Sequence, residues 1–233
     1  MTGPIAPIPV DLRVEPEIAA AVRLGLVRGE PVSVREASPE LDAEMAALAA
    51  DLAARHGGRS PAEIPGLAPA RDLYRAFGID PTRTRPSSEA LLRRVLLGKP
   101  LPRVLNAVDL CNLCSLRFLL PIGLYDAEAI RGPVELRRGR AGESFRGIRK
   151  DDIRLEGRPT VADAEGPFGN PSSDSLRTSV TPATRSLFLV IFAPAAFERA
   201  RLEDDVAFAR EAIERHLAPP GGSAATSGSL FPP

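Results

Sequence analysis

The feature that most restricts the fold is a wholly apolar run, Leu187–Ala193, made mainly of residues that favour strands. The run is too short to cross a membrane and is typical of a strand that is covered on both faces. Hydrophobic residues make up 44% of the 233 residues, so the chain can bury a full core around such a strand. We therefore expect Leu187–Ala193 to be the central strand of a sheet.

The remaining segments predict helices and strands that are partly segregated along the chain, which indicates the α+β class. The predicted helices are Pro16–Leu26, Pro39–His56, Ala70–Phe77, Ser87–Leu97, Val104–Phe118 and Ala195–Leu217. The other predicted strands are Val10–Val14, Pro31–Ala37, Val134–Arg137, Ser144–Ile148, Ile153–Leu155, Thr160–Asp163 and Arg177–Thr181. Residues 219–233 are rich in Gly, Ser and Pro and predict a disordered tail, which leaves residues 1–218 as a single domain.

Charge and cysteine usage narrow the classes of function. Lys and Arg balance Asp and Glu at 30 each, so no overall basic charge points to nucleic acid. Met1–Pro9 lacks the basic start and apolar core of a signal peptide, so cytoplasm is the expected compartment. Cys111 and Cys114 read as buried apolar thiols rather than half of a zinc site, because no second ligand pair is present. We expect no metal and no cofactor.

The predicted helix Val104–Phe118 carries an unusual polar stripe. Most of its positions are apolar, yet Asn106, Asp109 and Asn112 recur every third residue and share one narrow face. Buried polar side chains need partners. The stripe is therefore either a structural network that caps loops or one wall of a binding site, and the sequence does not decide between them.

A second constellation is Gly166–Thr178, which is dense in Gly, Pro, Asn, Ser and Asp. Its length and residue mix exceed what a plain strand connection needs, so a functional loop is favoured over an ordinary surface loop. Asp174, Ser175, Arg177 and Thr178 would project at its end.

A third constellation precedes the predicted helix at Ser87. Arg83 and Arg85 lie there with hydroxyl side chains, where a helix N-terminus can hold a phosphate. A plain helix-capping turn explains the same residues. No catalytic-serine elbow, zinc-protease motif or phosphate loop is present, so motifs alone leave the chain unassigned.

Two segments, Asn106-Ala-Val-Asp-Leu-Cys-Asn112 and Pro121-Ile-Gly-Leu-Tyr-Asp126, resemble the editing domain (B3/B4 domain) of the phenylalanyl-tRNA synthetase beta chain. That family has Asn, two apolar residues, Asp, an apolar residue, Thr and Asn, and later Pro-x-His-Ala-Phe-Asp. Ile130–Glu143 and Asp163–Thr178 resemble the strand, Gly-Glu turn and glycine-rich site loop that follow. The likeness spans residues 74–194 and is nearest to free-standing versions of the domain.

The resemblance implies a mixed or antiparallel sheet flanked by helices, and a pocket that hydrolyses the ester of a mischarged aminoacyl-tRNA. Three departures stand out. The synthetase His falls at Gly123 and its Thr at Cys111, and its late Glu has no acidic counterpart within Ser186–Phe192. The residues that recognise a tyrosyl group in the synthetase are therefore not retained. Free-standing members are thought to clear other mischarged pairs, and an arginine-like amino acid is one candidate.

The resemblance also suggests roles for residues. Asp174 would orient water, and Ser175, Arg177 and Thr178 would hold the terminal ribose and last phosphate. The remaining expected site residues bind substrate, namely Asn106, Asp109, Asn112, Asp163, Gly169 and Asn170, or tRNA, namely Arg83 and Arg85. Two alternatives stay open: a non-catalytic module that binds tRNA or an amino acid, and a small-molecule amidohydrolase. The expected partner is mischarged aminoacyl-tRNA and not a membrane, and the oligomeric state is left open, a monomer included.

Overall fold

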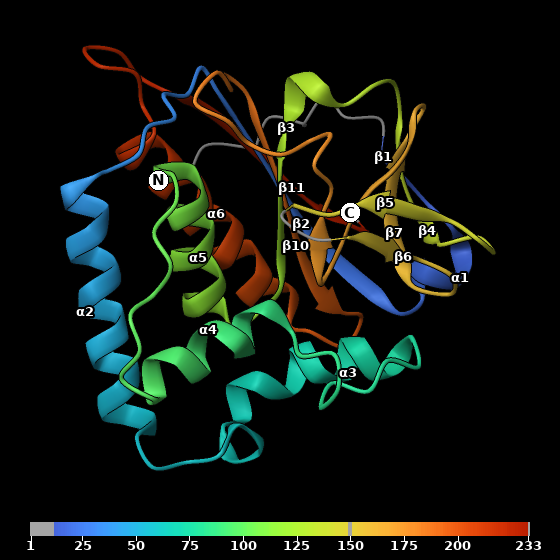
Figure 1. Ribbon diagram of the computed structural model, residues 1–233, viewed down its shortest axis with the longest axis horizontal. Helices are drawn as coiled ribbons and strands as arrows, with labels where there is room; N and C mark the ends of the chain where they lie inside the picture. The colour runs from blue at the N-terminus through green and yellow to red at the C-terminus, as the bar shows by residue number, and fades with distance from the viewer. Residues whose placement is uncertain (1–11, 149–150, 233) are drawn as a thin grey trace.

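Strand β10 (Leu187–Pro194) is the buried centre of the computed structural model, which describes residues 12–148 and 151–232 (Figure 1). Residues 187–193 are each at most 2% exposed. β10 pairs antiparallel with β2 (Val22–Glu30) and β3 (Ile122–Asp126), and β2 also pairs with β11 (Ala225–Phe231). The apolar run is therefore a central strand, as predicted, within the sheet order β11-β2-β10-β3.

The two faces of β10 contact different layers. Leu187, Leu189 and Ile191 face helices, where they pack with residues of α2, α5 and α6. Phe188, Val190 and Phe192 face a second sheet of order β1-β4-β7-β8-β9. Figure 1 shows α2, α4, α5 and α6 on one side of the β10 sheet and β1, β4 and β7 on the other. Alternate residues of one strand thus belong to two cores, which is why the run has no polar positions.

The elements confirm the predicted α+β class. The helices are α1 (Pro16–Ala19), α2 (Pro39–His56), α3 (Ala68–Ala76), α4 (Ser87–Leu96), α5 (Asn106–Phe118) and α6 (Arg199–His216). The second sheet contains β1 (Leu12–Val14), β4 (Val134–Arg138), β7 (Pro159–Asp163), β8 (Gly166–Asn170) and β9 (Ser173–Asp174). A separate hairpin consists of β5 (Ser144–Arg146) and β6 (Asp152–Arg154). Within residues 12–148 and 151–232, no helix has the length and apolar character that a membrane crossing needs.

The predicted helix Pro16–Leu26 is wrong beyond its first turn. α1 ends at Ala19, and β2 begins at Val22. A Cβ at Gly25 or at Gly29 would lie 2.7 Å from a side chain of α6. Close packing of α6 on this sheet therefore selects a strand with glycines, a tertiary effect that overrides the local helical pattern.

Other expected boundaries also change. Pro31–Ala37 is not a strand; its Val32 and Ser33 N–H groups donate to Arg185 and Leu217 carbonyls instead of a strand partner. Arg177–Thr181 is not a strand either, whereas β3 and β8 were not predicted. The part of Val10–Val14 before Leu12 lies outside the described residues.

The predicted disordered tail is also wrong for residues 225–231, which form edge strand β11 along β2. Gly228 allows the strand to lie against α6, because a Cβ there would be 2.6 Å from Val206 Cγ1. The Arg210 side chain reaches across and donates to Thr226 Oγ1 at 3.2 Å. The limits of the predicted domain, residues 1 and 218, stay predictions.

Gly228→Ala tests this packing. The added methyl group would overlap Val206 and Arg210, so we expect it to lower the unfolding free energy by about 1–3 kcal/mol. Gly222→Ala is the matched control, because a Cβ there would be no closer than 3.7 Å to its neighbours. Chemical denaturation of both variants provides the measurement, and equal stabilities would contradict the contact between β11 and α6.

A second prediction concerns Asp205 of α6. Burial raises the pKa of this carboxyl to about 6. Below about pH 4 both folded and unfolded chains hold the proton, whereas between about pH 4 and 6 the folded chain alone holds it. The unfolding free energy should therefore fall as pH rises through that window. Asp205→Asn should raise the unfolding free energy by about 1–2 kcal/mol at pH 7 and by little at pH 4. The expected increase is this small because Asp205 is partly exposed and solvent screens its charge. Denaturation at both values would show this difference, and an equal gain at both would contradict it.

Candidate functional site

A cavity of about 820 Å³ lies between α5, the start of α4, strand β3 and the turn from β8 to β9. Its walls are mainly apolar, contributed by Leu91, Val104, Val108, Ile122, Leu124 and Val180. The polar lining includes Glu36, Asn112, Ser172, Ser173, Asp174 and Thr181. This combination of apolar walls with a few polar groups is typical of a small-molecule site.

Asp174 is one of the two carboxylates that line this cavity. It lies in β9, opposite Gly169 of β8, and its Oδ2 accepts the Leu124 N–H at 3.3 Å. Burial, followed by the nearby charge of Asp174, raises the pKa of the Cys111 thiol above its usual range. Cys111 therefore stays protonated and is a poor nucleophile, although it also lines the cavity.

The turn before Asp174 is fixed by hydrogen bonds. Asn170 Oδ1 accepts the N–H groups of Ser172 and Ser173 at 2.8 and 2.9 Å. Tyr74 of α3 donates its hydroxyl to the Pro171 carbonyl at 3.0 Å. Burial raises the pKa of Tyr74 to about 12, so this hydroxyl remains a donor at neutral pH. The turn is thus anchored on α3 and presents two serines and one aspartate to the cavity.

Tyr125 of β3 fills the space behind Asp174, between the two sheets. A Cβ built on Gly123 of β3 or on Gly169 of β8 would lie 2.1 Å from its hydroxyl oxygen. Its ring packs edge-on against Phe168, with centroids 4.8 Å apart. Burial, followed by the charge of Asp174, raises the pKa of Tyr125 well above its usual range, so the hydroxyl stays neutral. Position 123 therefore has no room for a side chain while Tyr125 occupies this place.

Three residues predicted to be catalytic do not line the cavity. Ser175 and Thr178 are buried, with their hydroxyl oxygens 3.1 Å apart, and Ser175 Oγ also accepts the Thr178 N–H. Arg177 donates to Asp163 Oδ1 at 2.8 Å and contacts Glu165 Oε2 at 3.3 Å. Arg177, predicted to be catalytic, is thus paired with Asp163, predicted to bind substrate, and neither residue lines the cavity.

The polar stripe of α5 is partly a structural network and partly a wall of the cavity. Asn106 accepts the Arg35 N–H at 2.9 Å and donates to the Ser33 carbonyl, so it ties the 31–37 segment to the helix start. Asp109 accepts the Val104 N–H at 3.2 Å, and burial raises the pKa of its carboxyl. Only Asn112 of the three lines the cavity.

The other predicted site residues do not line the cavity. Gly169 packs against Tyr125, and the Asn170 side chain shapes the turn. Arg83 is 89% exposed and lies 3.7 Å from Asp80. Arg85 lies 3.3 Å from Glu89 and two residues before Ser87, which lines the cavity.

Several lining residues were not predicted. Ser172 and Ser173 lie inside the predicted loop but lacked a distinguishing signal, and Val180 and Thr181 were assigned to a strand. Tyr125 stood in a segment already matched to the family, yet its role depends on Gly169, which is remote in sequence. Among the described residues, no group of three or more His, Cys, Asp or Glu side chains is arranged to hold a metal ion.

Comparison with known proteins assigns the chain to a family. Residues 69–216 match the model of the B3/4 domain, and the chain belongs to that family. It is 34% identical over 127 residues to the phenylalanine–tRNA ligase beta subunits of two strains of Xanthomonas campestris pv. campestris. That match covers 51% of this chain but only 15% of each subunit, so the chain spans a small part of its curated relatives.

A structural comparison finds an N-terminal fragment of the phenylalanyl-tRNA synthetase beta-subunit from Pyrococcus horikoshii. The TM-score is 0.46 at 13% sequence identity, with 96% of this chain and 52% of the fragment covered.

The contact between Tyr125 and Gly123 can be tested by a double-mutant cycle. Gly123→Ala should lower the unfolding free energy by about 1–3 kcal/mol, because the added methyl group overlaps the Tyr125 side chain. Tyr125→Leu removes the ring and should relieve the overlap, so the double variant should be more stable than additivity predicts by about 1 kcal/mol or more. Denaturant titration of all four proteins gives the coupling, and strict additivity would show that the two positions are not in competition.

Proposed function

We propose that this B3/4 domain is a trans-acting deacylase that hydrolyses the ester between an amino acid and the terminal ribose of a mischarged tRNA. The observation that carries the proposal is the cavity, in which Asp174 and Asn112 meet apolar walls in a domain related to a tRNA ligase subunit. Aminoacyl-tRNA is made and used in the cytoplasm, so we expect the chain to act there.

The size and lining of the cavity suit an amino acid joined to a ribose. A volume of about 820 Å³ lies within the range of small-molecule sites, which is about 300–1,000 Å³. Asp174 and Glu36 can accept hydrogen bonds from an ammonium group, while Val108 and Leu124 contact an aliphatic stem. With Asp109 and Asp163 outside the lining, these two carboxylates are the acidic groups that favour a cationic amino acid, such as an arginine-like one.

The chemistry makes modest demands on the protein. An ester of this kind is already activated, so hydrolysis needs a positioned water and donors for the developing oxyanion. Asp174 would orient the water, or the vicinal ribose hydroxyl would do so, and Asn112 and the serine hydroxyls of the turn would donate hydrogen bonds. Burial raises the pKa of the Cys111 thiol and so disfavours a thiolate nucleophile, and we propose direct attack by water.

The roles suggested for Ser175, Arg177 and Thr178 stay predictions. Their contacts favour positioning over direct action on the substrate, because each bonds within the segment that carries Asp174 or to the neighbouring β7–β8 turn. Arg83 and Arg85 likewise remain proposed tRNA contacts at the α4 side of the cavity.

Asp174→Asn tests the assignment. Loss of the carboxylate charge should lower kcat/KM for deacylation by about 100-fold, a typical contribution of a positioned acid or base. Asp51→Asn is the matched control, because Asp51 is exposed on α2 and does not line the cavity. The assay offers a panel of cognate and mischarged aminoacyl-tRNAs and scores ester loss. A rate equal to that of the unaltered chain would remove Asp174 from the mechanism.

The same panel separates the alternatives. A non-catalytic module would bind aminoacyl-tRNA without ester loss on any member of the panel. The cavity lining contains no His to act as a general base, and this observation favours a non-catalytic binding module as the second candidate. An amidohydrolase acting on small molecules would be insensitive to added tRNA.

A further inference from the structure

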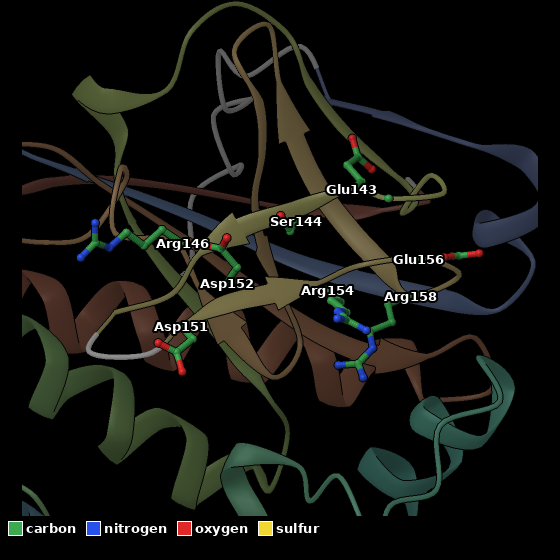
Figure 2. Close-up of a pocket in the computed structure, with 9 residues that line it drawn as sticks. Glu143, Ser144, Arg146, Asp151, Asp152, Arg154, Glu156 and Arg158 are labelled. Atoms are coloured by element: carbon green, nitrogen blue, oxygen red, sulfur yellow. The ribbon is translucent and has the colours of Figure 1, made fainter.

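A second hollow lies outside the cavity, on the β5–β6 hairpin. This open groove of about 780 Å³ is lined by both strands and the segments that flank them (Figure 2). Three arginines line it: Arg146, Arg154 and Arg158. Among the described residues, none of the three lies within ion-pair distance of a carboxylate, whereas Arg71, Arg137 and Arg177 are all paired. The groove therefore holds unused guanidinium groups, which suit phosphate.

The acidic residues of the groove are not spread evenly. Glu143 receives two hydrogen bonds from Arg137, at 2.6 and 2.8 Å, so its charge is already balanced. Figure 2 shows Asp151 and Asp152 toward one end of the hairpin and Arg154 and Arg158 toward the other. The Glu156 side chain points away from these two arginines in the same view. Arg154 and Arg158 thus lie together at one end of the groove, apart from Asp151 and Asp152.

The groove and the cavity share a wall. Arg146 lines the groove, and Ile148, two residues later, lines the cavity. The Leu176 N–H donates to the Arg146 carbonyl at 2.8 Å, and the Ile148 N–H donates to the Asp174 carbonyl at 3.4 Å. The segment 146–148 therefore borders both hollows and is hydrogen-bonded to the segment that carries Asp174.

A second link runs along the turn that precedes Asp174. Arg158 lines a small hollow together with Asn170 and Ser172, and Ser172 also lines the cavity. The Asn170 side chain is 2% exposed, and its amide nitrogen has no hydrogen-bond partner among the described residues. An unused donor thus lies beside Arg158 on the path between the two hollows.

We propose that the groove binds the phosphodiester backbone of the RNA whose aminoacylated 3′ end occupies the cavity, with Arg154 and Arg158 as the phosphate contacts. This inference rests on the proposed function, because it takes the occupant of the cavity to be the end of an RNA chain. An RNA chain that runs from the cavity over the shared wall would bring its phosphates to the guanidinium groups of Arg154 and Arg158, which have no ion-pair partner among the described residues. Arg83 and Arg85, in contrast, already have Asp80 and Glu89 as neighbours.

The test measures binding of unfractionated, uncharged tRNA to the full chain over a range of KCl concentrations. Arg154→Ala/Arg158→Ala should weaken binding by about tenfold and reduce the slope of log K against log salt by about 1.4, or 0.7 for each lost contact to a single strand. Asp151→Asn/Asp152→Asn should tighten binding, because it removes repulsion from the other end of the groove. Arg59→Ala is the matched control, since Arg59 is exposed and follows the end of α2, a helix that Figure 1 shows on the opposite side of the molecule from β5.

A substrate without phosphates separates this proposal from the deacylase itself. The arginine double variant should hydrolyse an aminoacyl ester of adenosine at the rate of the unaltered chain, because that ester reaches only the cavity. Equal losses on adenosine ester and tRNA would mean that the substitutions damage the cavity, and they would overturn the groove assignment. So would unchanged tRNA affinity in the double variant, or no tRNA binding by the unaltered chain. Weakened tRNA binding in the variant, with no ester hydrolysis by any form, would support the groove and refute the deacylase.

Discussion

Burial of β10 on both faces is the constraint on which the rest of this structure depends. Residues 187, 189 and 191 face the helices, and residues 188, 190 and 192 face the second sheet. A strand in this position needs covering layers on either side, since each exposed face would leave large apolar side chains in water. The helical layer places α5 beside β3, and the second sheet places β8 and β9 behind it. The cavity forms where these two layers meet at the β3 edge.

Tyr125 connects the two layers at that edge and fills the space behind Asp174. Its ring stands between glycines of different sheets, so the sequence choices at positions 123, 125 and 169 depend on one another. The position that carries His in the synthetase domain is empty of a side chain here, and the adjoining polar group is the carboxylate of Asp174. Under the proposed function, a carboxylate at this place favours a cationic amino acid over a phenolic one. The Tyr125 side chain thus explains why position 123 of this chain carries no side chain.

Most positive charges of this chain belong to arginines. Some of these arginines are paired with carboxylates and hold the structure together, and others have no such partner and can contact a ligand. Arg137 and Arg177 hold turns of the second sheet through Glu143 and Asp163. Arg154 and Arg158 have no such partner among the described residues and line an open groove beside the segment that carries Asp174. A net charge of zero thus does not reveal where unpaired arginines gather, which is the kind of feature that a composition-based argument about nucleic acid misses.

The sequence by itself determined the central strand, the helices α2 to α6, the strands β4 and β7, the α+β class and the B3/4 family, because these depend on local periodicity, capping residues and motif order. Tertiary packing decided which further segments are strands. β2 and β11 pack closely against α6, which leaves room only for glycine at positions 25, 29 and 228. This contact joins segments that are far apart in the sequence, so local patterns do not reveal it. Packing also decided which polar residues face the cavity. Asn112 and Asp174 do so, while Asn106, Ser175 and Arg177 find structural partners, since equal spacing along a helix or loop does not reveal which neighbouring element lies opposite.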